Sequence, residues 1–167
     1  QLKCDSCDAL QRVKPQRPAQ LPKAKHFGDQ VHTDLLQCYN AVNESIWMCN
    51  NVDSASVFQV SGPLGSQTAQ AVTRFLDQRW LAWAGPPDVW AADHGPEYTS
   101  AHFATWCEAH GSRLWNVAVE APWQNSPAER HGGTFKAVFQ HLVRKFNVTT
   151  LEDAEMAAAM TNWAHNA

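Results

Sequence analysis

The spacing of the apolar side chains changes along the chain, and this change constrains the fold more than any other feature of the sequence. Apolar and polar residues alternate in three short runs, 30–38, 45–50 and 57–60, which is a strand pattern. From Ala69 to Trp83 apolar residues recur every three or four positions, and Gly85 with two prolines ends this pattern. The first half of the chain therefore predicts a three-strand meander followed by an amphipathic helix.

The second half continues with alternating strand and helix signals. A short buried strand is predicted over 88–92, a helix from the N-cap Ser100 to Gly111, and a further strand over 114–119. A long helix over 127–146 has one apolar face, and a last helix begins after an N-cap candidate at Thr149. The apolar face of the long helix consists of Phe135, Val138, Phe139, Leu142 and Phe146. The order predicts an α/β domain with a mixed five-stranded sheet flanked by helices.

A length of 167 residues suits one domain with tails. We expect residues 1–26 to be a cysteine-bearing segment followed by a basic, proline-rich linker, and residues 27–167 to be the domain. The chain has no apolar run of membrane-spanning length and no signal peptide, so we expect an intracellular protein without a membrane partner. Cys38, Cys49 and Cys107 are scattered among apolar residues, which predicts reduced core thiols rather than disulfides.

The net charge of −3 argues mildly against a nucleic-acid partner, but the charge is unevenly distributed. Residues 1–27 hold six basic and two acidic residues, whereas residues 28–112 hold two arginines and nine acids. Such a chain fits a protein that holds phosphates at its edges and cations at its centre. A solvated tail on an acidic domain explains the charges equally well.

Three carboxylates occupy positions that suit metal-dependent phosphodiester transfer, which requires hard oxygen ligands. Asp34 lies within a predicted strand, Asp93 at the carboxyl end of another, and Glu129 in the first turn of the long helix. Each position also has a structural interpretation: an edge-strand polar residue, a turn aspartate and a capping-box glutamate, respectively. The interval between Asp93 and Glu129 decides nothing, because Asp8 and Glu44 have the same separation.

Several blocks of sequence, taken in order, resemble the integrase catalytic core of retroviruses and long-terminal-repeat retrotransposons. The blocks are Val31-His32-Thr33-Asp34, Asn51-Val52-Asp53-Ser54-Ala55-Ser56, Trp83-Ala84-Gly85-Pro86-Pro87, Asp93-His94-Gly95-Pro96-Glu97-Tyr98 and Ala121-Pro122-Trp123-Gln124-Asn125-Ser126-Pro127-Ala128-Glu129-Arg130. The Glu-Arg pair in the last block is typical of copia-like and gypsy-like elements. The order and spacing of the blocks are more specific than any single block.

The resemblance implies a ribonuclease-H-like fold in which Asp34, Asp93 and Glu129 bind Mg²⁺ or Mn²⁺. It also implies an integrase that processes the ends of a retroelement DNA and joins them to target DNA, acting in the nucleus as a homo-oligomer. Asn125, Arg130 and Lys136 are the residues expected to contact DNA, although Lys136 also fits an ordinary solvated lysine. Two alternatives remain open: an inactive or domesticated relative that only binds DNA, and a related nuclease that cuts without joining.

The sequence departs from the family pattern at His94, Trp123 and Ser126, and the pair Gly132-Gly133 should soften the long helix by about 1 kcal/mol per glycine.

Cys4 and Cys7 resemble the second half of the family's His-His-Cys-Cys zinc module. Zinc binding would need histidines that precede residue 1, since structural zinc takes four ligands. We expect His26 and His32 to be linker and strand residues rather than substitutes.

Overall fold

The computed structural model describes residues 23–116 and 126–167, with side chains from Arg130 onward in the second range. Within these ranges five strands form one sheet in the order β3-β2-β1-β4-β5. They are β1 (Gln30–Tyr39), β2 (Ser45–Asp53), β3 (Gln59–Leu64), β4 (Val89–Ala92) and β5 (Arg113–Asn116). The first three form an antiparallel meander, and β4 and β5 are parallel to β1. The predicted mixed five-stranded sheet is therefore confirmed.

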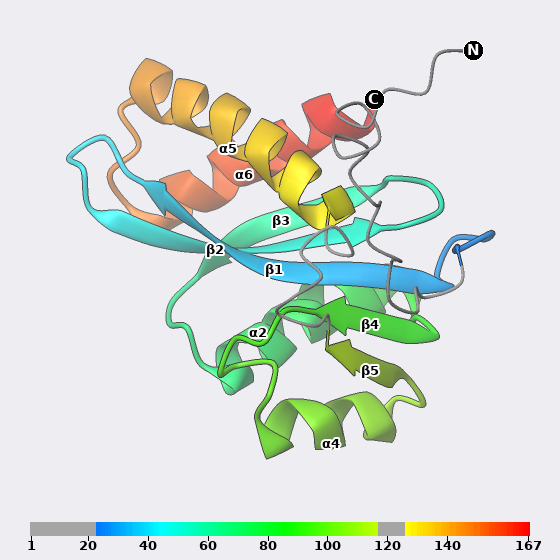
Figure 1. Cartoon of the computed structure of the whole chain (residues 1–167). Coiled ribbons are helices and arrows are strands. Elements are labelled where there is room, and N and C mark those ends of the chain that lie inside the picture. The colour runs from blue at the N-terminus through cyan, green and yellow to red at the C-terminus, as the bar shows by residue number, and fades with distance from the viewer. Residues whose placement is uncertain (1–22, 117–125) are drawn as a thin grey trace, which may run out of the picture.

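Helices cover both faces of this sheet (Figure 1). One face carries α2 (Ala69–Leu76), which continues through a π-helical turn η1 (Asp77–Leu81) into α3 (Ala82–Ala84), and α4 (Ala101–Ala109). The other face carries α5 (Ser126–Phe146) and α6 (Leu151–Asn166). In the described part of the chain, no helix is long and apolar enough to cross a membrane.

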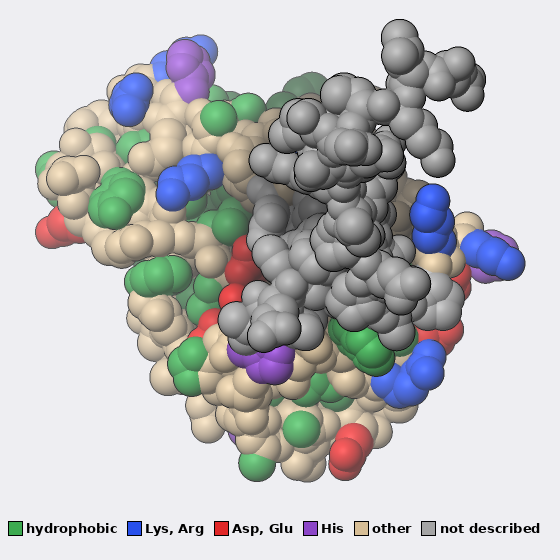
Figure 2. All heavy atoms as spheres, in the orientation of Figure 1, with side chains coloured by type: hydrophobic (Ala, Val, Ile, Leu, Met, Phe, Trp, Pro, Cys, Tyr) green, Lys and Arg blue, Asp and Glu red, His purple; other side chains and the backbone are tan. Residues whose placement is uncertain are grey.

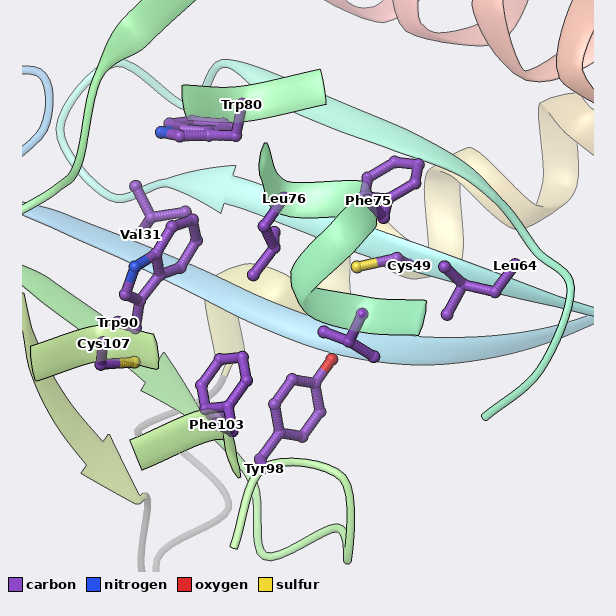
Figure 3. Packing of buried hydrophobic residues seen from close by; sticks show 12 residues of the cluster. Val31, Cys49, Leu64, Phe75, Leu76, Trp80, Trp90, Tyr98, Phe103 and Cys107 are labelled. Carbon is purple, nitrogen blue, oxygen red and sulfur yellow. The ribbon is translucent and has the colours of Figure 1, made fainter. Parts of the chain in front are cut away.

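Alternate residues of β1 contribute to two separate cores, as the period of a strand requires. Val31 belongs to the core under α2 and α4, and Cys38 to the core under α5 and α6. In the first core Tyr98 lies beside Phe103, and Trp90 lies near Val31 (Figure 3). The three described cysteines are buried and free, and burial raises the pKa of Cys49 to about 12, so the predicted reduced core thiols are confirmed.

The turn between β2 and β3 lies later in the chain than the predicted strand runs, 45–50 and 57–60, indicate. The strand β2 continues to Asp53, and β3 begins only at Gln59, because the side chain of Asp53 organises the segment between them. Its Oδ2 accepts hydrogen bonds from the backbone N–H groups of Ala55 and Ser56 and from the Ser56 hydroxyl. Val57 then adopts a positive φ of 66°, which a strand does not allow. Asp53 and Ser56, which belong to the sequence block 51–56, thus shape a turn.

The helix bounds also depart from the predictions in detail. The π-helical turn shifts the helical register, so Trp83 is 54% exposed although its spacing places it on the buried face. On α5 the buried stripe follows Phe135, Phe139 and Val143, whereas Val138 and Phe146 are exposed. The last helix is capped by Thr150, not Thr149. In contrast, Ser100 caps α4 as predicted, and its hydroxyl accepts a hydrogen bond from the Phe103 N–H.

Two asparagines of α6 cover the outer edge of β3. The carboxamide of Asn162 accepts from the Ser61 N–H at 3.0 Å and donates to the Ser61 carbonyl at 2.7 Å. Asn166 makes the same pair of bonds with Gln59, at 2.9 and 2.7 Å. Four residues of helix rise about 6 Å and two residues of strand about 6.6 Å, so the two ladders match. Side-chain amides therefore replace a sixth strand at this edge.

Candidate active site

Asp34 and Asp93 come from neighbouring parallel strands and lie next to each other. Thr33 of β1 pairs with Ala92, the last residue of β4, so the residues that follow them are the two aspartates. β4 ends there while β1 continues to Tyr39 with β2 as its paired strand. The strand β4 therefore does not extend alongside Asp34, and both aspartates are partly exposed. Asp34 lies in a central strand, so its interpretation as an edge-strand residue is wrong.

Backbone N–H groups next to the two aspartates bind one oxygen of each carboxylate. The Leu35 N–H donates to Asp34 Oδ1 at 2.8 Å, and the Gly95 N–H donates to Asp93 Oδ1 at 2.9 Å. The second bond shows that Asp93 also shapes the turn after β4. Its interpretation as a turn aspartate is therefore compatible with its interpretation as a candidate metal ligand. Both bonds limit the rotation of carboxylates that lie at one edge of the sheet.

Glu97 is a further carboxylate near Asp93, and the sequence predicted no role for it. A methyl group added to Gly95 would stand 3.0 Å from Asp93 Oδ1 and would clash with the Glu97 carboxylate. Both carboxylates therefore approach Gly95 closely, and a side chain at this position would require them to move. Burial raises the pKa of Glu97, and the negative charge of Asp93 raises it further. The available sequence signal was an acid four residues after Asp93.

A buried tyrosine packs on the opposite face of the sheet, behind the residue that precedes Asp34. Tyr98 is fully buried, and its hydroxyl lies 3.2 Å from the Thr33 hydroxyl. Burial raises its pKa well above the usual value, and the nearby charges of Asp34 and Glu97 act in the same direction. Tyr98 is therefore a neutral support behind the residue that precedes Asp34.

Helix α5 runs along β1 on the face that carries Asp34. Gly132 lies against the side chain of Leu36, Lys136 is close enough to Cys38 to influence its charge, and Gln140 donates to the Tyr39 carbonyl at 2.7 Å. Helix and strand thus advance in the same direction. Glu129 lies in the first turn of α5, three residues before Gly132, and its side chain is outside the described part.

The other predicted site residues stand as follows. Lys136 and Arg130 are exposed on α5, and His94 is exposed beside Asp93. His26 precedes β1 and His32 lies within it, as predicted. Cys4, Cys7, Trp123 and Asn125 lie outside the described residues, so the zinc module and this DNA contact remain predictions.

The donor chemistry of this edge suits a hard divalent cation. Acidic side chains gather near the middle of one face of the molecule (Figure 2), and Asp34 and Asp93 supply the carboxylate oxygens that Mg²⁺ prefers. Among the described residues, no three His, Cys, Asp or Glu side chains are arranged to hold a metal ion. Glu129, the third predicted ligand, is not among those residues because its side chain is outside the described part.

Comparison with known proteins gives one family match and one curated relative. Residues 24–119 match the family model of the integrase core domain. The insertion element IS476 uncharacterized 39.2 kDa protein of Xanthomonas euvesicatoria is 37% identical over 110 residues. The aligned part covers 66% of this chain but only 29% of that relative.

Two solved structures have a similar fold. One is the simian T-cell lymphotropic virus intasome in complex with PP2A regulatory subunit B56 gamma, with a TM-score of 0.74 and 18% identity, covering 95% of this chain and 56% of that chain. The other is the HTLV-2 integrase catalytic core domain in complex with magnesium in a dimeric form, with a TM-score of 0.66 and 16% identity, covering 83% of this chain and 86% of that chain. The predicted ribonuclease-H-like fold is confirmed by these neighbours.

Proposed function

Because the chain belongs to the integrase core domain family, we propose that it is the catalytic core of a DNA integrase that joins the ends of a mobile element to target DNA. The observation that carries this proposal is the adjacency of Asp34 and Asp93 where β4 ends. In open α/β sheets, the carboxyl ends of parallel strands are the usual place for functional groups. The chain spans a small part of its curated relative, so the proposal concerns the activity of this core.

We propose that Asp34, Asp93 and Glu129 together hold Mg²⁺ or Mn²⁺. The register of α5 on β1 supports the inclusion of Glu129. Gly132 lies against Leu36, and Glu129 is one helical turn before Gly132. A similar distance back along β1 from Leu36 is two residues, which reaches Asp34. The HTLV-2 core was solved with magnesium, which supports the choice of cation. Bound divalent cations would activate the attacking oxygen and stabilise the leaving oxygen of the phosphodiester.

The proposed reaction has two steps at phosphorus. Water first attacks a phosphodiester near the end of the element's DNA, and the 3′-oxygen leaves as a free 3′-hydroxyl. That 3′-hydroxyl then attacks a phosphodiester of the target and displaces the target's own 3′-oxygen. In both steps this chain would hold and orient the reacting groups. Backbone N–H groups restrict the carboxylates of Asp34 and Asp93, and Tyr98 packs behind the strand that carries Asp34. A rigid site of this kind suits a reaction that forms no covalent bond to the enzyme.

DNA contact is proposed for the exposed polar side of α5 and the segment before it. Lys136 lies two helical turns after Glu129, on the same side of the helix, and would bind a phosphate there. Arg130 and Asn125 flank the glutamate in sequence and would contact DNA beside it. Basic side chains over α5 and acidic ones near the middle of the same face are visible in Figure 2. We also propose a homo-oligomer, in line with the dimeric form of the HTLV-2 core.

A DNA-joining assay tests the proposal. The chain would be incubated with short duplexes and Mg²⁺ or Mn²⁺, alongside Asp34→Asn, Asp93→Asn and Glu129→Gln, and products would be separated by length. We expect the parent to cut and join DNA, and each variant to lose both activities while its circular dichroism stays near that of the parent, because an amide keeps the shape but not the charge. An active variant would remove that residue from the site.

The same assay separates the alternatives. Cut products without joined products would identify a nuclease. DNA that is bound but unchanged would identify a binding protein and contradict the proposed activity.

A further inference from the structure

Gly132 is the point of closest approach between α5 and the strands of the site. A methyl group added there would stand 3.0 and 3.2 Å from the two Cδ atoms of Leu36 and 3.3 Å from Asn50 Nδ2. These separations are below an ordinary van der Waals contact, so any side chain at this position requires movement of the helix or of its neighbours. Gly133, the next residue, has open space around it.

The neighbours of Gly132 belong to the same part of the sheet as Asp34. Leu36 is two residues after Asp34 and therefore on the same face of β1, and Asn50 is the residue of β2 that pairs directly with Asp34. A displacement of α5 at Gly132 would thus change its distance from the strand that carries the aspartate.

Asn50 has little freedom to give way. It is fully buried, and its Oδ1 accepts hydrogen bonds from Gln59 Nε2 and, at 2.7 Å, from the Ser61 hydroxyl. Gln59 and Ser61 are themselves buried, and their backbones are held by Asn166 and Asn162 of α6. Gln59 Nε2 also approaches the His131 carbonyl of α5 at 3.5 Å. The Asn50 side of the contact is therefore a fixed polar layer, and the other side is formed by the Leu36 side chain.

We propose that Gly132 is a positioning residue: its missing side chain sets the separation of α5 from β1 and so fixes where Glu129 stands relative to Asp34 and Asp93. Glu129 is one helical turn earlier on the same side of α5. Metal ligation tolerates errors of only about 0.2 Å, so a shift of a few tenths of an ångström matters there. This inference rests on the proposed function and assigns Gly132 a role in it.

The helix offers its own matched control, since Gly132→Ala and Gly133→Ala make the same chemical change one residue apart. Manganese binding to each variant would be measured by titration calorimetry without DNA, together with the melting temperature and DNA joining. We expect Gly133→Ala to bind Mn²⁺ within about twofold of the parent and to melt at a higher temperature, because alanine favours the helix. Gly132→Ala should bind Mn²⁺ about 10-fold more weakly or worse, as when the support of a ligand is removed.

A second variant separates positioning from a general loss of stability. Leu36→Ala removes the two nearest atoms, so Gly132→Ala combined with Leu36→Ala should recover much of the manganese affinity, even though Leu36→Ala alone lowers the melting temperature. If Gly132→Ala binds Mn²⁺ and joins DNA as well as Gly133→Ala, or if the double variant folds and shows no recovery, Gly132 has no positioning role. A parent that binds no Mn²⁺ would instead overturn the proposed function itself.

Discussion

At the scale of single residues, Asp34 and Asp93 are brought together by the different lengths of two adjacent strands. β4 stops at Ala92 and the chain turns at Asp93, whereas β1 continues past Asp34 to Tyr39. The Glu97 carboxylate approaches Gly95 close to that of Asp93. The negative charges of this edge are thus concentrated by backbone geometry.

The sequence singles out the two aspartates as candidates, whereas it gives only a weak signal for Glu97 and none for Gly132. Asp34 interrupts a strand pattern and Asp93 ends one, and both signals are local. The approach of Glu97 depends on the turn at Gly95, and the importance of Gly132 depends on how closely a helix lies to a sheet. The two glycines that were expected to soften α5 differ in their surroundings. Gly133 is exposed with open space around it, whereas Gly132 is buried against neighbouring side chains.

Lys136 carries the residue-scale prediction about DNA. Lys136→Glu should weaken binding to a short duplex and reduce the slope of log Kd against log salt by roughly one to two units, because a phosphate contact and its released counterion are lost. Lys145→Glu is the matched control, since it makes the same charge change in the last turn of the same helix. Fluorescence anisotropy at several salt concentrations measures both slopes. Equal slopes for the parent and Lys136→Glu would leave Lys136 an ordinary solvated lysine.

At the scale of elements, the order of strands and helices followed from the spacing of apolar residues, but several bounds did not. Gly62 and Pro63 lie inside β3, although both residues usually weaken a strand. They are tolerated because β3 pairs with β2 on one side only and its other edge is held by α6. The π-helical turn that exposes Trp83 has no local sequence signal that we recognise.

The asparagines of α6 carry the element-scale prediction. Asn162→Asp and Asn166→Asp keep the shape of the side chain but lose the donor to the β3 carbonyl, and each should lower the free energy of unfolding by about 1 to 3 kcal/mol. Met156→Ala, at a position of the same helix that is 66% exposed, should change it by no more than about 0.5 kcal/mol. Urea denaturation followed by circular dichroism measures these values. Asparagine variants as stable as Met156→Ala would mean that the edge of β3 does not depend on α6.

At the scale of the whole molecule, the sheet separates two hydrophobic cores that support different parts of the proposed site. The core under α2 and α4 holds Tyr98 and supports the strand ends that carry the aspartates. The core under α5 and α6 determines the path of the helix that carries Glu129. The proposed site therefore lies between the two cores. Strand patterns place the two aspartates at neighbouring strand positions, whereas the position of Glu129 depends on how the other half packs.

The central claim is that Asp34, Asp93 and Glu129 form one divalent-cation site, and the melting temperature of the chain with and without Mg²⁺ tests it most directly. Adjacent carboxylates repel each other in the metal-free protein, and a cation that binds only the folded cluster stabilises it. About 10 mM Mg²⁺ acting on a millimolar site should add roughly 1.4 kcal/mol, or about 2 to 5 °C.

The decisive comparison is with Asp93→Asn, with sodium chloride at matched ionic strength as the control for screening. We predict that Asp93→Asn melts at a higher temperature than the parent without metal, because repulsion is relieved and the Gly95 N–H keeps an acceptor. It should also lose most of the response to Mg²⁺. If Mg²⁺ raises the melting temperature of the parent no more than sodium chloride does, or raises that of Asp93→Asn as fully as that of the parent, these carboxylates do not form a metal site.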